Sequence, residues 1–154
     1  MGKLVGFDIG ENSVKMVAFS GKELKKAVTV ELPDAMVENQ LDGLIAQLRG
    51  QLEGQGATLE QYLEYSGTTM EQLREHAREQ AATAARYELA MTEIARREGI
   101  EITEEELEQQ YGALSAQYGL SRELLRQQLP PMKLRHDLKL ARARAVVVEN
   151  AKRI

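Results

Sequence analysis

The pattern of apolar and polar positions changes near residue 33. Before it, apolar and polar residues alternate in three runs, at residues 3–9, 13–20 and 24–32. Alternation with a period of two is typical of strands, and the Gly, Asn and Ser residues between the runs favour tight turns. The pattern predicts a short three-stranded β-meander, which Pro33 ends because proline cannot donate to a strand ladder.

After residue 33 the apolar positions recur every three or four residues, as they do on one face of a helix. The first such stripe predicts a helix that begins at Asp34. Three glycines weaken it, so we expect it to fray after about residue 50. Its apolar positions are Val37, Leu41, Leu44, Leu48 and Leu52.

Further helix starts are marked by capping boxes, in which a Thr hydroxyl and a Glu or Gln three residues later each bond a backbone amide. The matching pairs are Thr58 with Gln61, Thr68 with Glu71, and Thr103 with Glu106. They predict helices over residues 59–65 and 69–98, and a third that begins after Thr103 and stops at Gly119.

The long helix carries an Ala-rich stripe, whose small side chains allow another helix to come close. The stripe consists of Leu73, Ala77, Ala84, Tyr87, Met91 and Ile94, and the next helix presents Leu107, Tyr111, Leu114 and Tyr118. Ser121 caps a short helix, and two prolines separate it from a last one with Leu134, Leu138, Ala141, Ala145 and Val148. The predicted fold class is mainly α.

Composition narrows the function classes. The chain of 154 residues contains no Cys, which excludes disulfides, thiolate catalysis and cysteine metal sites. It has no apolar run of the length that a membrane span requires, so we expect a cytoplasmic protein. The net charge is +2 over residues 1–30, −11 over 31–132 and +5 over 133–154. The acidic middle argues against nucleic acid as a partner.

Few residues suggest catalysis. His76 and His136 are the only histidines, and neither has a second ligand at the spacing of a helical metal site. No serine lies in a GxSxG motif. We therefore expect no enzyme activity, no metal and no cofactor.

The segment DIGENSVK is the exception, because a turn of this kind can present backbone amides to a phosphate. Asp8, Gly10, Ser13 and Lys15 are its candidate phosphate-loop residues. Over about thirty residues the sequence resembles the first phosphate loop of actin-like ATPases, particularly the one that assembles type IV pili. That family also needs a second phosphate loop and an adenosine pocket, for which this chain has no room. A nucleotide-binding pilus-assembly module is therefore the alternative function.

Four segments after residue 31 carry a family resemblance: LPDAMVENQLD at 32–42, LEQYLEYSGTT at 59–69, EGIEITEEEL at 98–107 and VENAK at 148–152. Through them, residues 32–154 resemble the C-terminal domain of trigger factor, the bacterial ribosome-associated chaperone. The resemblance implies an elongated helical domain with two arms, which forms a cradle for unfolded or nascent polypeptides and works without ATP. The predicted domains are a β-meander at 1–31 and the helical domain at 32–154.

Other modules of that family are not recognised in the sequence. It contains no GFRxGK-type ribosome-binding loop, and the hairpin segment stands where a prolyl isomerase domain is expected. The change of resemblance at VTVELPD predicts a chimera, in which Phe7 and Phe19 are buried against the cradle.

Client binding requires apolar side chains that adapt to different sequences. The predicted set is Met36, Leu41, Leu44, Leu48, Met91, Ile94 and Leu138. Because these residues also have core spacing, the alternative is that they pack inside the domain. A further alternative is a non-catalytic module that forms a homodimer through the unpaired edges of the meander.

Overall fold

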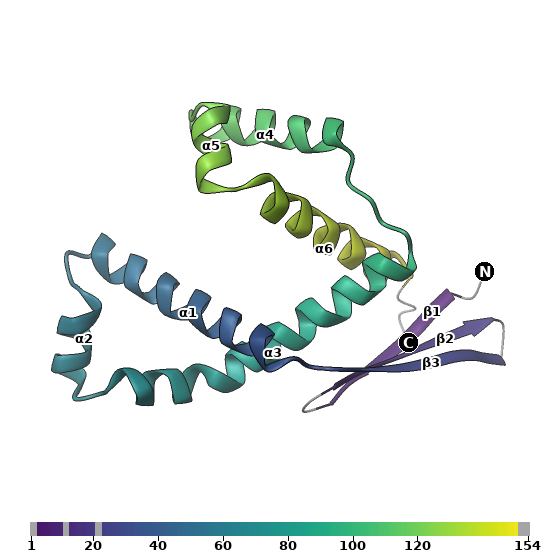
Figure 1. Ribbon diagram of the computed structural model, residues 1–154, viewed down its shortest axis with the longest axis horizontal. Coiled ribbons are helices and arrows are strands. Elements are labelled where there is room, and N and C mark those ends of the chain that lie inside the picture. Colours follow the sequence, from purple (N-terminus) through teal and green to yellow (C-terminus); the bar gives the residue numbers. More distant parts are fainter. Residues whose placement is uncertain (1–2, 11–12, 21–22, 151–154) are drawn as a thin grey trace. The chain divides into compact units, whose positions relative to one another are not determined.

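The computed structural model describes residues 3–10, 13–20 and 23–150. Within these residues the chain is mainly helical, as the sequence predicts (Figure 1). Strands β1 (Lys3–Ile9), β2 (Ser13–Ser20) and β3 (Glu23–Glu31) come first. They are followed by α1 (Asp34–Gly54), α2 (Leu59–Ser66), α3 (Met70–Arg97), α4 (Glu104–Tyr118), α5 (Arg122–Gln128) and α6 (Pro131–Asn150).

The residues group into two compact units, 1–89 and 90–154, which are described separately below. The first unit contains the strands, α1, α2 and most of α3. The second contains the end of α3 and the three helices that follow it. The domain boundary between residues 31 and 32 stays a prediction.

The strands lie in the order β1-β2-β3, and each neighbouring pair is antiparallel. Val14 in the central strand is fully buried, and its register partners are Ile9 and Val30. The centres of both predicted turns, residues 11–12 and 21–22, lie outside the described residues. The burial predicted for Phe7 and Phe19 likewise concerns side chains that the structure does not describe.

The core of the first unit lies between α1 and α3. Val37 and Leu41 pack against Ala81 and Ala85, which are both fully buried. Close helix contact through small residues was predicted, but the prediction placed Ala84 on the stripe, and this residue is only half-buried. In an Ala-rich helix the neighbouring positions are chemically alike, so the sequence does not show which alanine faces the partner.

Local capping explains most helix ends. The predicted boxes at Thr58 and Thr103 are both present, with hydrogen bonds in both directions, and Ser121 accepts from the Leu124 amide. Gly67, Gly99 and Gly119 have positive φ angles where their helices stop, as expected for glycine in the left-handed region.

Two predictions about helix ends are wrong. The capping box of α3 is formed by Thr69 and Gln72, one residue later than predicted, and the Thr68 hydroxyl instead lies 3.5 Å from the Ser66 carbonyl oxygen. Helix α1 does not end near residue 50. It continues to Gly54, because backbone amides beyond its end bond the Leu52 and Glu53 carbonyls.

The core of the second unit lies among α4, α5 and α6. Leu107, Tyr111, Leu125 and Leu134 form it. Tyr111 is fully buried, and its hydroxyl donates a 2.6 Å hydrogen bond to the Leu129 carbonyl. Burial raises the pKa of Tyr111. The bond ties α4 to the segment just before the proline pair, which satisfies the one polar atom that this side chain brings into the core.

Candidate polypeptide-binding surface

Large apolar side chains lie exposed on α2 and at the start of α3. Leu59, the first residue of α2, is buried, whereas the side chains further along the helix are not. Tyr65 is 96% exposed, and Tyr62 and Met70 are each more than a third exposed. Apolar groups that water reaches in a folded chain are available to bind other apolar groups.

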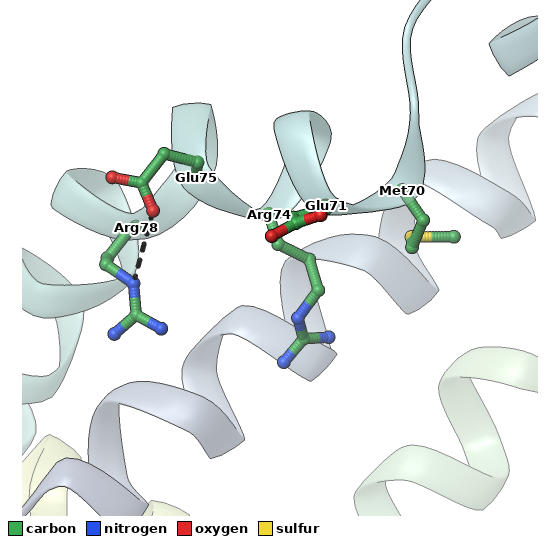
Figure 2. A pocket seen from close by; sticks show the side chains of 5 residues that line it. All are labelled: Met70, Glu71, Arg74, Glu75 and Arg78. Atoms are coloured by element: carbon green, nitrogen blue, oxygen red, sulfur yellow. Dashed lines mark ion pairs between the residues drawn. The ribbon is translucent and has the colours of Figure 1, made fainter.

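Met70 lies at a shallow depression of about 480 Å³, whose other lining residues are charged (Figure 2). These are Glu71, Arg74, Glu75 and Arg78, all from α3. Figure 2 shows the Arg78 and Glu75 side chains directed at each other, with 3.8 Å between Nε and Oε2.

The two arginines of the depression are occupied by partners on α1. Arg74 donates to Asp42 at 2.7 Å and to Glu38 at 2.8 Å, and Arg78 donates to Glu38 at 2.6 Å. The hydrogen bond from Arg74, followed by the one from Arg78, lowers the pKa of Glu38. Because these cations are already paired, the depression is better suited to join α1 to α3 than to bind an anion.

In the second unit, α4 and α6 each carry exposed apolar side chains as well as buried ones. On α4 the stripe begins with the buried Leu107 and Tyr111 and ends at Tyr118, which is 61% exposed. On α6, Leu134 is buried while Met132 is 82% exposed and Val148 is 66% exposed. Each of these two helices therefore carries buried apolar side chains that belong to the core and exposed ones that are accessible at the surface.

The residues predicted to bind clients are not the exposed ones. Leu41, Met91 and Ile94 are buried, at 0%, 3% and 1% exposure, and as they stand they contact only their own chain. The other four are half-buried and could present part of their surface; they are Met36, Leu44, Leu48 and Leu138. A client-binding role for these seven residues stays a prediction.

Half of the large apolar residues that are exposed in the described part of the chain are tyrosines, and none of these eight residues is in the predicted client-binding set. Tyr62, Tyr65 and Tyr118 stand at or near core spacing in amphipathic helices. The sequence signal that could have identified them is the phenol hydroxyl, because this polar group makes an exposed tyrosine less unfavourable than an exposed leucine. Exposure itself depends on which helix covers which stripe, and the sequence does not show that.

The structure brings the candidate phosphate-loop residues together in a hairpin. Asp8 in β1 is the register partner of Lys15 in β2, and Lys15 is exposed. The Gly10 amide donates a 2.9 Å hydrogen bond to the Ser13 carbonyl, and both residues are half-buried. One amide that a phosphate would need is therefore occupied within the turn.

Metal sites and membrane-spanning helices find little support in the part of the chain that is described. There, no group of three or more His, Cys, Asp or Glu side chains could hold a metal ion. His76 is exposed and His136 is half-buried. Of the described helices, none combines the length and the apolar content that a membrane span needs.

Comparisons with known proteins point to one family. Residues 17–149 match the family described as bacterial trigger factor protein (TF) C-terminus. The chain is 34% identical to trigger factor of Exiguobacterium sibiricum over 131 residues, which is 82% of this chain and 30% of the relative. It is 27% identical to trigger factor of Lactobacillus acidophilus over 146 residues, which is 95% of this chain and 33% of the relative. No solved structure matches the chain significantly.

These matches correct the interpretation of the first thirty residues. The alignment with the Lactobacillus acidophilus protein covers 95% of the chain, so it includes most of the segment that resembled a pilus ATPase. That resemblance is not supported, and the chimera stays a prediction. The chain spans only 28% to 33% of the length of such relatives. It belongs to the family of the bacterial trigger factor C-terminus.

Proposed function

We propose that this chain is the polypeptide-binding part of an ATP-independent chaperone, which holds unfolded or nascent segments against exposed apolar side chains. Membership of the trigger factor C-terminus family supports the proposal. No catalytic step, metal or nucleotide takes part in it, and a cytoplasmic location belongs to the same proposal. The observation that carries it is the exposure of Tyr65 and Met132, at 96% and 82%.

The chemistry of the exposed residues suits clients of many sequences. Met132 has an unbranched, polarisable side chain that can adapt to differently shaped apolar partners. Tyr65 offers a rigid apolar ring together with a hydroxyl that can bond a client's backbone. Because both side chains are almost fully exposed, the shape of a pocket would select little, and we expect weak and promiscuous binding.

The half-buried residues of the predicted set extend this surface. Met36 and Leu44 lie beside the core between α1 and α3, and Leu138 lies beside that of the second unit. In this proposal they contribute the parts of their surface that water reaches. Leu41, Met91 and Ile94 serve the core, and they become available only if a unit opens.

Suppression of aggregation tests the proposal directly. The wild-type chain should suppress aggregation of a chemically denatured reporter enzyme, without nucleotide, in a dose-dependent way. We expect the double variant Tyr65→Ser, Met132→Ser to need about threefold more protein for the same effect, because two exposed apolar contacts are lost.

The control replaces exposed polar residues of the same two units. Gln51 and Gln127 are both exposed, so Gln51→Ser, Gln127→Ser changes as many surface positions without removing apolar area. The control should match wild type, and melting curves should show that all variants fold. Equal suppression by the two double variants would contradict the proposed surface, and no suppression by wild type would contradict the proposed function.

A further inference from the structure

The sheet of the first unit has strand edges that are free among the described residues. The order β1-β2-β3 leaves β2 paired on both sides, while β1 and β3 each have one side without a described strand beside it (Figure 1). Backbone amides and carbonyls along such a side can bond another extended segment.

The edge of β3 is the more regular of the two. The pairing of β1 with β2 shifts between Leu4 and Gly6, and the pairing of β2 with β3 shifts near the lysine-containing start of β3. From Ala27 to Glu31 the register with β2 is unbroken, and this stretch contains no glycine, proline or lysine. Bulges, prolines and lysines are the usual protections of an edge, and residues 27–31 have none of them.

The side chains of residues 27–31 form a pattern that is symmetric about Thr29. Val28 and Val30 are half-buried, whereas Ala27, Thr29 and Glu31 are exposed, so the two valines share one face of the sheet. In an antiparallel pair, residues directly opposite each other lie on the same face. Two copies of this stretch centred on Thr29 therefore match valine with valine and threonine with threonine.

We propose that β3 pairs with β3 of a second copy of this chain, antiparallel and centred on Thr29. The two three-stranded sheets then form one continuous sheet, with Val28 opposite Val30 of the partner subunit. The charge pattern of the sequence favours the antiparallel direction, because the strand has lysines near its start and Glu31 at its end, so a parallel partner would put like charges beside each other. The contact is short, so the dimer is weak and depends on concentration. It does not depend on chaperone activity.

A disulfide crosslink tests the geometry, and the chain suits this test because it has no cysteine. Thr29→Cys places two thiols opposite each other at the centre of the contact. Lys15→Cys is the matched control, because Lys15 is the register partner of Thr29 on β2, is also exposed, and lies one strand further from the edge. Under mild oxidation we expect T29C to form the linked dimer about tenfold faster than K15C. Equal rates overturn the proposal.

Two charged substitutions at Ala27 should change the dissociation constant of the dimer in opposite directions. In the proposed register Ala27 lies opposite Glu31 of the partner subunit, twice in each dimer. Ala27→Glu places like charges there and Ala27→Lys places opposite charges. By sedimentation equilibrium we expect the dissociation constant to rise about tenfold for A27E and to fall for A27K.

Both variants should keep the wild-type circular dichroism and melting temperature, because Ala27 is exposed. A wild-type chain that stays monomeric at every concentration overturns the proposal, and so does a shift of the same sign in both variants. If β3 instead accepts a strand of an unfolded client, the chain alone is monomeric and only added peptide slows the exchange of the Val28 to Val30 amides.

Discussion

Glu93 lies near the end of α3 and pairs with two arginines that follow it, Arg96 and Arg97. Arg96 donates two hydrogen bonds to its carboxylate, at 2.9 Å from Nε and 2.6 Å from Nη2, and Arg97 Nε donates a third at 2.7 Å. These bonds, those from Arg96 above all, lower the pKa of Glu93 from 4.5 to about 2, although partial burial opposes them. The charged form of this side chain is therefore the one that stabilises the fold.

Replacing Glu93 by Gln should destabilise the chain only at pH values at which the Glu93 carboxylate is charged. At neutral pH we expect the free energy of unfolding to fall by about 1 kcal/mol. Because the folded-state pKa lies below the unfolded one, the contribution is complete above about pH 4.5 and disappears as the pH falls toward about 2. Urea unfolding of E93Q and wild type across this range measures it. The exposed Glu98 provides the control E98Q, and a difference that persists at the lowest pH would contradict the assignment.

At the scale of elements, the sequence predicts most where the controlling interactions are local. Helix starts depend on a hydroxyl and a side chain three residues later, so the boxes at Thr58 and Thr103 could be predicted correctly. At α3, two threonines stand next to each other and both spacings offer a partner, Glu71 or Gln72. The choice between them depends on the backbone conformation of the turn after Gly67, and the local sequence pattern does not specify this conformation.

The two threonines give a direct test of that choice. Thr69→Ala removes the acceptor of the Gln72 amide and should lower the free energy of unfolding by about 1 kcal/mol. Thr68→Ala removes only a long contact to the Ser66 carbonyl and should cost less than half as much. Chemical denaturation of both variants measures the difference. A larger cost for T68A would favour the box predicted from the sequence.

At the scale of the whole molecule, each unit combines a small apolar core with its own ion pairs. In the first unit Arg74 joins α3 to Glu38 and Asp42 of α1. In the second, Lys139 on α6 pairs with Glu101 at 3.0 Å, and Arg142 contacts both Glu106 and the Glu101 carbonyl. Single exposed pairs contribute little, but several that join the same two segments can hold them in register.

The two-unit organisation predicts that a substitution in one unit destabilises that unit and leaves the other unchanged. In Arg74→Gln we expect hydrogen exchange to become roughly two- to fivefold faster at the Leu41 and Ala81 amides and to stay unchanged at Leu107. Arg142→Gln should show the reverse pattern. Exchange measured by NMR or mass spectrometry distinguishes the two outcomes. Equal acceleration in both units by either variant would show that they unfold as one body.

Family and fold class could be predicted from the sequence, whereas the exposed surface could not. The segments that resemble trigger factor and the helical periodicity lie within single stretches of chain. Whether a stripe is core or surface depends on other helices, and that is why Leu41 is buried while Tyr65 is exposed. The resemblance to a pilus ATPase finds no support, and a short Gly-containing turn between strands was a weak signal for it because such turns are common to many folds.

The contrast between Tyr65 and Tyr111 also has an optical consequence. The chain contains no tryptophan, so its near-ultraviolet emission comes from five tyrosines alone. Tyr65 is almost fully accessible to a dissolved quencher, whereas Tyr111 is shielded and its hydroxyl is engaged with the Leu129 carbonyl. Four of the five tyrosines are exposed and only Tyr111 is buried. A client that covers α2 would therefore protect the fluorescence of Tyr62 and Tyr65 from the quencher and leave the quenching of Tyr111 unchanged.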